Sequence, residues 1–250
     1  VSETYICPQG FSGQYRLLIR RIWGEVSTGH ATVDIVTDLG SAGFGRPYAS
    51  GSFSVAPNGT VAYTRGTPTA PAEVGVIGRS GKPETLTALN DDFFAKRTLG
   101  TVEEVTWQSS VGDYEIQGWL VKPPNFDPDE KYPLILEIHG GPIADYGDRF
   151  SAEVQLYAAK GNLVLYTNPR GSWSYGEEFG NLIHHAYPGN DYDDLISGVD
   201  AVIERGYVDE DRLYVTGGSG GGVLTAWIVG KTDRFAAAAV QKPVINWASF

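Results

Sequence analysis

Hydrophobic and polar positions divide the chain into two parts with different patterns. Before about residue 100, short apolar or β-branched runs alternate with turn signals, and no convincing amphipathic helix interrupts them. After that point, apolar runs alternate with segments of helical periodicity. The first pattern is typical of antiparallel β structure, and the second predicts a mainly parallel sheet covered by helices. We therefore expect two domains, over residues 1–100 and 101–250.

The first part predicts a meander of strands. Its clearest hairpin joins residues 53–56 to residues 60–64 through Pro57-Asn58-Gly59, because Asn and Gly tolerate the positive φ of tight turns. The other predicted strands are residues 15–19, 31–36, 73–77 and 84–89. Such strands are typical of a β-sandwich or a β-propeller, and we favour the propeller. A blade takes about 40–45 residues, so this part supplies about two blades, which cannot close a ring.

The second part predicts alternating strands and helices. An antiparallel pair surrounds the Gly112-Asp113 turn, and a helix over residues 193–204 places Leu195, Val199 and Val202 on one face, with Asn190 or Asp191 as its cap. The predicted strands are residues 102–107, 115–121, 134–138, 163–166 and 213–216, and the other predicted helices are residues 149–159 and 223–229.

The segment Gly217-Gly218-Ser219-Gly220-Gly221 fits the pattern G-x-S-x-G between a predicted strand and a predicted helix. In that context the pattern forms a nucleophile elbow, a strained turn that exposes the serine hydroxyl and needs small neighbours. A phosphate-binding loop is disfavoured because neither glycine-rich phosphate motif is present. A flexible connector is disfavoured because apolar segments flank both ends. Ser219 is therefore the candidate nucleophile.

A second glycine-rich segment, Ile138-His139-Gly140-Gly141-Pro142, follows the first strongly apolar strand of the second part. An α/β-hydrolase places half of its oxyanion hole at this point. The backbone N–H groups of Gly141 and Gly220 would then be the two donors to the oxyanion. The alternative is a plain turn in which His139 is a hydrogen-bonded structural residue.

Composition narrows the class of protein. With 42% hydrophobic and 20% charged residues, the chain is typical of a globular protein, and a net charge of −11 disfavours binding to nucleic acid or anionic membranes. No apolar stretch is long enough for a membrane span, and the first twenty residues lack a signal pattern. We expect a soluble protein, cytoplasmic or periplasmic, since a lone cysteine does not decide the compartment. The absence of methionine indicates a processed chain, a domain or a fragment.

Four motifs in this order resemble the prolyl oligopeptidase family of serine peptidases, and within it the acylaminoacyl-peptidase branch. They are Ile138-His139-Gly140-Gly141-Pro142; Asn168-Pro169-Arg170-Gly171-Ser172 with Tyr175-Gly176 and Phe179; Gly217-Gly218-Ser219-Gly220-Gly221-Gly222; and Pro243-Val244-Ile245-Asn246-Trp247. The resemblance is strong over residues 101–250 and weak over residues 1–100, where residues 53–63 resemble a propeller strand pair. It implies a partial α/β-hydrolase core preceded by antiparallel blades of a β-propeller that restricts access to the serine.

The resemblance also implies roles for individual residues. Ser219 matches the nucleophile, and Gly141 and Gly220 match the oxyanion donors. Positions lining the pocket for the residue before the scissile bond match Val244, Trp247 and Phe250. His139 stands where the prolyl-oligopeptidase and dipeptidyl-peptidase branches have a tyrosine whose hydroxyl helps to hold the oxyanion, which argues against those two branches.

One departure from the family pattern concerns the catalytic triad. Its order in α/β-hydrolases is Ser, then Asp or Glu, then His, yet no histidine follows Ser219, and the only later acid, Asp233, belongs to a turn. We expect the triad acid and histidine beyond residue 250. Because an unactivated serine is a poor nucleophile, this chain alone is predicted to be nearly inactive.

Other polar residues are assigned structural roles. His184 and His185 are adjacent, so their side chains are expected to point in different directions and to pack under a loop rather than bind a metal. Acidic residues 191–194 and 209–211 lack the spacing of a calcium loop and are interpreted as a solvated face. Arg170 is expected either near the mouth of the active site or paired with a carboxylate.

The sequence thus predicts a serine-type peptidase that hydrolyses short peptides through an acyl-enzyme on Ser219, with no metal or organic cofactor. The alternatives are an esterase or lipase on the same fold, and a catalytically incomplete fragment that binds peptides. The predicted partners are a short peptide substrate and the remainder of the catalytic domain, with a homo-oligomer left open and neither nucleic acid nor membrane expected.

Overall fold

The computed structural model describes residues 3–8, 15–20, 45–49, 51–78 and 80–248, without the side chains of the first two stretches. Strands β1 (Glu3–Pro8) and β2 (Tyr15–Arg20) form an antiparallel pair, as expected for residues 15–19. The strand predicted over residues 31–36 and the pocket residue Phe250 lie outside the described residues.

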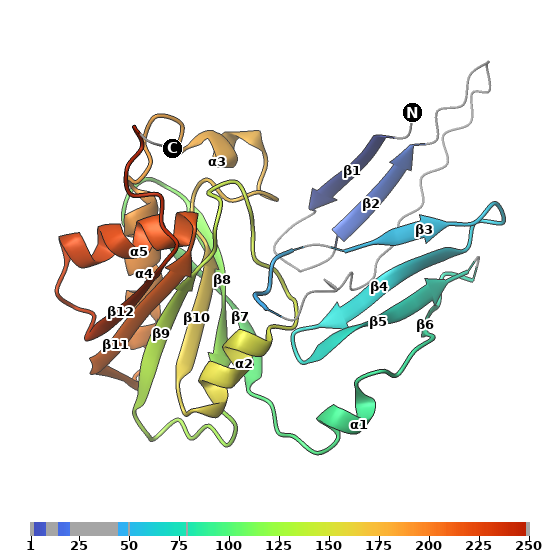
Figure 1. Ribbon diagram of the computed structural model, residues 1–250, viewed down its shortest axis with the longest axis horizontal. Helices are drawn as coiled ribbons and strands as arrows, with labels where there is room; N and C mark the ends of the chain where they lie inside the picture. The colour runs from blue at the N-terminus through green and yellow to red at the C-terminus, as the bar shows by residue number, and fades with distance from the viewer. Residues whose placement is uncertain (1–2, 9–14, 21–44, 50, 79, 249–250) are drawn as a thin grey trace.

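A four-stranded antiparallel sheet in the order β3-β4-β5-β6 follows (Figure 1). Its strands are β3 (Phe53–Val55), β4 (Val61–Thr67), β5 (Ala70–Ile77) and β6 (Pro83–Thr85). The predicted hairpin is confirmed, but the strand predicted over residues 84–89 ends early, because Thr87 Oγ1 accepts the Val74 N–H. A helix of four residues, α1 (Asp91–Phe94), was not predicted. The propeller itself stays a prediction.

The second part builds a six-stranded mixed sheet in the order β12-β11-β9-β10-β8-β7. The strands are β7 (Thr101–Gln108), β8 (Glu115–Lys122), β9 (Tyr132–Ile138), β10 (Leu163–Asn168), β11 (Val208–Gly218) and β12 (Ala237–Gln241). The helices are α2 (Ala152–Ala159), α3 (Glu177–Asn181), α4 (Asp191–Ile203) and α5 (Gly220–Lys231). All elements predicted after residue 100 are present, while α3 and β12 were not predicted.

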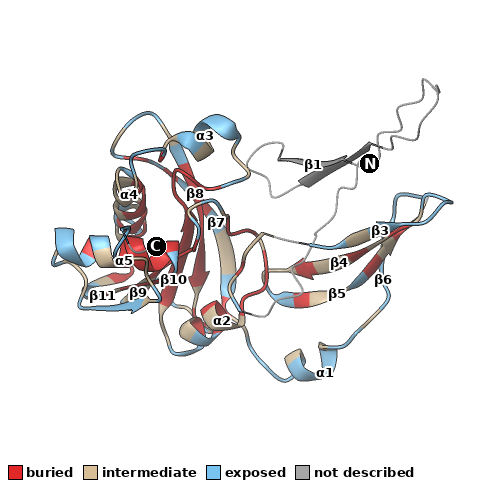
Figure 2. Cartoon of the chain, turned by 45° about the horizontal axis from the view of Figure 1, so that its top comes forward, coloured by how far each residue is buried: buried red, intermediate tan, exposed pale blue. Residues whose placement is uncertain are grey.

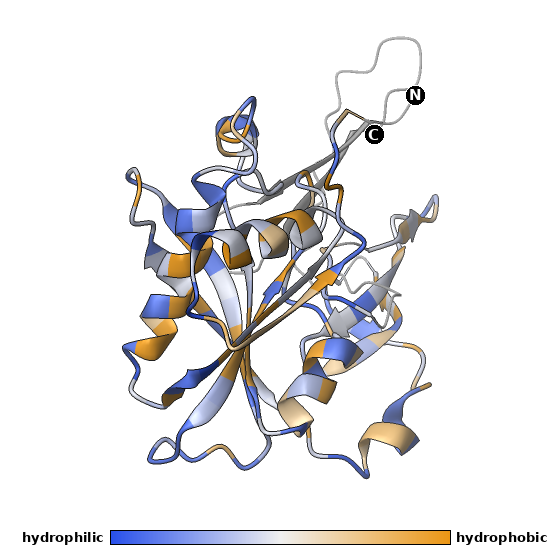
Figure 3. Cartoon of the chain, turned by 60° about the vertical axis from the view of Figure 1, so that its left-hand side comes forward, coloured by the Kyte–Doolittle hydropathy of each residue, from blue (hydrophilic) through white to orange (hydrophobic). Residues whose placement is uncertain are grey.

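Helices cover both faces of this sheet because its strands alternate apolar side chains between them. Leu163 and Leu165 of β10 face α4 and α5, whereas Val164 and Tyr166 face α2. Burial is concentrated in this sheet and its helices, while the β3–β6 sheet is largely exposed or intermediate (Figure 2). The helices carry both hydrophobic and hydrophilic residues, as expected of helices with one face on a sheet (Figure 3). The main core therefore lies after residue 100.

The sheet register brings the two glycine-rich segments together. β11 is parallel to both β9 and β12, and Gly217 of β11 is level with Ile138 and with Val240. The segments that follow these strands therefore start at the same edge of the sheet, where α/β folds place their sites. Among the described residues, no helix has the length and apolar character needed to cross a membrane.

Candidate active site

Ser219 lies between β11 and α5 and is exposed, although the residues on either side of it are buried. Its backbone has φ 58° and ψ −118°, a conformation that costs a non-glycine residue on the order of 1–3 kcal/mol. Its N–H donates to Gln241 O at 3.0 Å, and Val223 N–H donates to its carbonyl oxygen at 3.0 Å. The turn is thus held from both sides with its hydroxyl presented at the sheet edge.

The glycines around Ser219 are required by close backbone contacts. A Cβ at Gly217 would lie 2.5 Å from Gly221 O, and a Cβ at Gly221 would lie 2.1 Å from Ile138 O. A Cβ at Gly222 would lie 2.4 Å from Gln241 O. These distances are too short for carbon and oxygen, so the elbow packs backbone directly against backbone.

The two predicted oxyanion donors lie side by side. A Cβ at Gly220 would be 2.6 Å from Gly141 O and 3.0 Å from Gly141 N, so the two backbones are in contact. Gly141 has φ 130°, which an L side chain rarely adopts, and it is exposed beside the exposed Ser219. The structure therefore brings Gly141, Gly220 and Ser219 together at one edge of the sheet.

His139 is buried at the start of the same loop. Its Nδ1 lies 2.7 Å from Gly140 O, which can only accept, so Nδ1 carries the proton; Nε2 lies 2.8 Å from Ser172 Oγ. Burial lowers the pKa of His139 to about 4, so its ring is neutral at neutral pH. His139 thus ties the loop after β9 to the loop after β10, a structural role that is compatible with either interpretation of this segment.

Neither of the other described histidines contacts Ser219. His184 and His185 are exposed, and their ring centroids lie 4.0 Å apart with an interplanar angle of 32°. The expectation that they point apart and pack under a loop is wrong: a positive φ of 57° at His185 turns the rings toward each other. His30 lies outside the described residues.

The interpretation of residues 191–194 as a solvated face is also wrong. Asp194 is fully buried because Arg170 reaches it from the loop after β10, with Nη2 2.6 Å from Oδ1 and Nε 2.8 Å from Oδ2. Asp191 is buried too, its Oδ1 accepting the Gly189 and Tyr192 N–H groups, and burial raises its pKa to about 6. Of the two alternatives for Arg170, the carboxylate pair is confirmed. Residues 209–211 remain largely exposed.

The segment after β12 carries two of the predicted pocket residues. Val244 is half-buried and Trp247 is 54% exposed. Tyr187, which the sequence did not single out, links this segment to the elbow: its hydroxyl donates to Gly220 O at 2.8 Å, and its ring centroid lies 6.3 Å from that of Trp247. Large exposed apolar side chains also follow β9, β10 and β12 at this edge: Ile143, Trp173 and Ile245.

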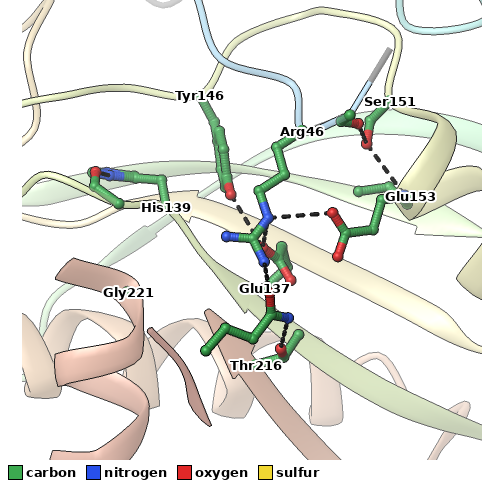
Figure 4. Close-up of polar contacts among 12 residues, drawn as sticks. Arg46, Glu137, His139, Tyr146, Ser151, Glu153, Thr216 and Gly221 are labelled. Carbon is green, nitrogen blue, oxygen red and sulfur yellow. Dashed lines mark hydrogen bonds and ion pairs between the residues drawn. The ribbon is translucent and has the colours of Figure 1, made fainter. Parts of the chain in front are cut away.

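A pocket of about 300 Å³ opens beside Ser219, and both parts of the chain line it. The lining residues are Gly45, Arg46, Tyr48, Glu153, Gly218, Ser219, Gln241 and Lys242. Arg46 enters from before the β3–β6 sheet, and its Nε lies 3.0 Å from Glu137 Oε1 and 3.2 Å from Glu153 Oε2 (Figure 4). Its Nη2 donates to Gln241 Oε1 at 3.1 Å. Nothing in the local sequence marks Arg46 or Tyr48 as site residues.

Glu137 is an acid within the central strand β9. Its side chain is fully buried, Tyr146 donates to Oε1 at 3.1 Å, and Oε2 has no hydrogen-bond partner in the described part of the chain. Burial raises the pKa of Glu137 to about 8. The positive charge of Arg46 lowers this pKa and the negative charge of Glu153 raises it, but burial has the largest effect. A buried acid whose protonated form is favoured by burial therefore lies under the pocket.

Comparisons with known proteins agree with these features. Residues 148–250 match the prolyl oligopeptidase family. The chain is 40% identical over 246 residues to the uncharacterized peptidase YuxL of Bacillus subtilis (strain 168), covering 92% of this chain and 37% of that protein. It is 32% identical over 148 residues to dipeptidyl-peptidase 5 of Schizosaccharomyces pombe, covering 57% and 22% respectively. The chain thus spans little more than a third of the length of the Bacillus subtilis peptidase and less than a quarter of the length of dipeptidyl-peptidase 5.

Solved structures resemble nearly the whole chain. An acylaminoacyl peptidase of Pyrococcus horikoshii has a TM-score of 0.79 at 26% identity, with 99% of this chain and 36% of that chain covered. An acylaminoacyl peptidase in complex with Z-Gly-Gly-Phe-chloromethyl ketone has a TM-score of 0.78 at 26% identity, with 99% and 38% covered. The resemblance to the prolyl oligopeptidase family is confirmed, and so is the α/β-hydrolase core.

Proposed function

We propose, from the relationship of this chain to the prolyl oligopeptidase family, that it provides the nucleophile and oxyanion hole of a serine peptidase that cleaves short peptides. The single observation that carries the proposal is the exposed, strained Ser219 beside the adjoining backbones of Gly141 and Gly220. A serine held in this way is positioned to attack a carbonyl carbon at the sheet edge.

In the proposed reaction, Ser219 Oγ attacks the carbonyl carbon of a peptide bond. The N–H groups of Gly141 and Gly220 donate to the oxygen that becomes negative. Collapse of this intermediate breaks the C–N bond, the amine leaves with a proton, and water then hydrolyses the ester on Ser219. The fixed backbone donors need no rearrangement as the charge develops.

The proton from Ser219 needs an acceptor. None of the three described histidines contacts Ser219, and buried His139 is neutral and bound to Ser172. Because the triad of α/β-hydrolases has its histidine after the serine and no histidine follows Ser219 in this sequence, the proposed base is a histidine outside residues 1–250, with its acidic partner, and we expect these residues alone to show only residual activity.

Substrate class is proposed from the pocket residues. Trp247 packs against Tyr187, whose hydroxyl donates to Gly220 O, whereas neither Val244 nor Trp247 lines the pocket of about 300 Å³ at Ser219. Their proposed contact with an apolar side chain before the scissile bond rests on the family resemblance. N-acylated peptides are proposed as the substrates because the similar solved structures include acylaminoacyl peptidases. The 32% identity to dipeptidyl-peptidase 5 makes peptides with a free amine the alternative.

The proposal is tested by kinetics on the longest natural reading frame that contains this chain. N-acetyl and free-amine peptides with an apolar residue before the cut are compared with a p-nitrophenyl ester. We expect kcat/KM to be highest for the N-acetyl peptides, and Ser219→Ala to lower turnover by at least about 10³-fold. Ester hydrolysis without peptide hydrolysis would indicate an esterase, and Ser219→Ala with full activity would overturn the proposal.

A further inference from the structure

Tyr48 lies in the pocket of Ser219 although it comes from the N-terminal part of the chain. The pocket of about 300 Å³ is lined by Tyr48 and Ser219 together. A Cβ at Gly140 would lie 2.9 Å from Tyr48 Oη and 3.4 Å from Ser219 Cβ, so both hydroxyl side chains flank the same glycine. The phenol is therefore positioned to contact a ligand that binds in this pocket.

Contacts with the hydrolase core fix the position of Tyr48. Its backbone forms an antiparallel bridge with Tyr146, and the following Ala49 N–H donates to Asp145 O at 3.0 Å. The rings of Tyr48 and Tyr146 are 4.9 Å apart with an interplanar angle of 60°. Arg46, two residues earlier, contacts Glu137, Glu153 and Gln241. The hydroxyl is thus preorganised before a ligand arrives.

The hydrogen bonding of Tyr48 leaves its own proton free. The hydroxyl oxygen accepts the Gly140 N–H at 2.7 Å. A phenol both accepts and donates, and no acceptor for its proton is found among the described residues. The O–H group therefore has one donor position that a ligand in the pocket can satisfy.

We propose that the Tyr48 hydroxyl donates a hydrogen bond to a backbone carbonyl oxygen of the bound peptide other than the one that Ser219 attacks. This inference rests on the proposed function, in which Gly141 and Gly220 serve the attacked carbonyl. A neutral O–H donor matches a neutral amide oxygen, whereas the nearby guanidinium of Arg46 is already bound to Glu137, Glu153 and Gln241. Tyr48 is then a specificity residue that distinguishes peptides from simple esters, and the N-terminal part completes the substrate site.

The test compares Tyr48→Phe with Tyr132→Phe in the longest natural reading frame that contains this chain. Tyr132 is a matched control, because its hydroxyl also accepts a backbone N–H, that of Asp127 at 2.9 Å, and it lies at the opposite end of β9. For Tyr48→Phe we expect kcat/KM on an N-acetyl tripeptide to fall about 10-fold more than kcat/KM on p-nitrophenyl acetate, which has no second carbonyl for the phenol to bind. Tyr132→Phe should alter neither rate.

The ester substrate distinguishes two roles of Tyr48: a hydrogen bond to the bound peptide, and support of the loop after β9 through the Gly140 N–H. If Tyr48 acted only by holding the Gly140 N–H, Tyr48→Phe would lower peptide and ester rates by the same factor, and that result would overturn the inference. Unchanged peptide kinetics would overturn it as well. If the wild-type protein hydrolyses neither substrate and Ser219 resists a fluorophosphonate probe, the proposed function fails first, and the role of Tyr48 fails with it.

Discussion

The tight turn around Ser219 depends on glycines that have no side chain. Gly221 lies so close to the Ile138 carbonyl that no side chain fits, whereas Gly230, later in the same helix α5, has open space where a Cβ would be. The G-x-S-x-G pattern predicts the need for small residues near Ser219, but the partners of each glycine come from β9 and β12 and appear only in the fold.

This difference predicts opposite effects of the same substitution within one helix. Gly221→Ala must displace backbone, so we expect it to lower the free energy of unfolding by about 1–3 kcal/mol. Gly230→Ala should raise it by about 0.5–1 kcal/mol, because alanine is the better helix former. Urea denaturation of both variants measures these values. Equal effects of the two substitutions would contradict the packing described for the elbow.

At the scale of elements, β9 carries more of the site than its apolar pattern indicates. The strand was predicted from its hydrophobic run, and the run is confirmed. Glu137 is an ionisable residue within this otherwise apolar strand, and such a residue needs a partner when it is buried. That partner, Arg46, is more than ninety residues earlier, and local patterns do not reveal such pairs.

Glu137 predicts a specific pH dependence of stability. Its pKa is about 8 in the folded protein against 4.5 ordinarily, so between these values the folded state holds a proton that the unfolded chain has lost. Its contribution to stability is therefore greatest below pH 4.5, declines as pH rises, and is lost above pH 8. Glu137→Gln removes this decline, so its unfolding free energy relative to wild type should increase by at least about 1 kcal/mol from pH 5 to pH 8. Thermal unfolding across that range is the measurement, and a pH-independent difference would disprove the raised pKa.

For the whole molecule, most of the helices and strands after residue 100 could be predicted from the sequence, whereas the contacts of Arg46 and Tyr48 with that part of the chain could not. Local sequence patterns are enough to predict the order of these strands and helices. They are also enough to single out Ser219 and the two glycines proposed as oxyanion donors, since the geometry of these segments is short-range. Other features depend on residues that are distant in sequence. Asp194 was predicted to lie on a solvated face because its partner, Arg170, is not a sequence neighbour. No local pattern predicts the contact of Tyr48 with Gly140. The site is thus assembled from both parts of the chain.

The nucleophilic role of Ser219 can be measured directly by covalent labelling. The longest natural reading frame that contains this chain is treated with a fluorophosphonate, digested and analysed by mass spectrometry, beside a Ser174→Ala control and the Ser219→Ala variant. Ser174 is a suitable control because its hydroxyl is already bound to Asp145. We predict a single adduct on Ser219 that persists in Ser174→Ala and disappears in Ser219→Ala. An adduct on another residue, or none on the folded protein, would contradict the assignment of Ser219 as the nucleophile.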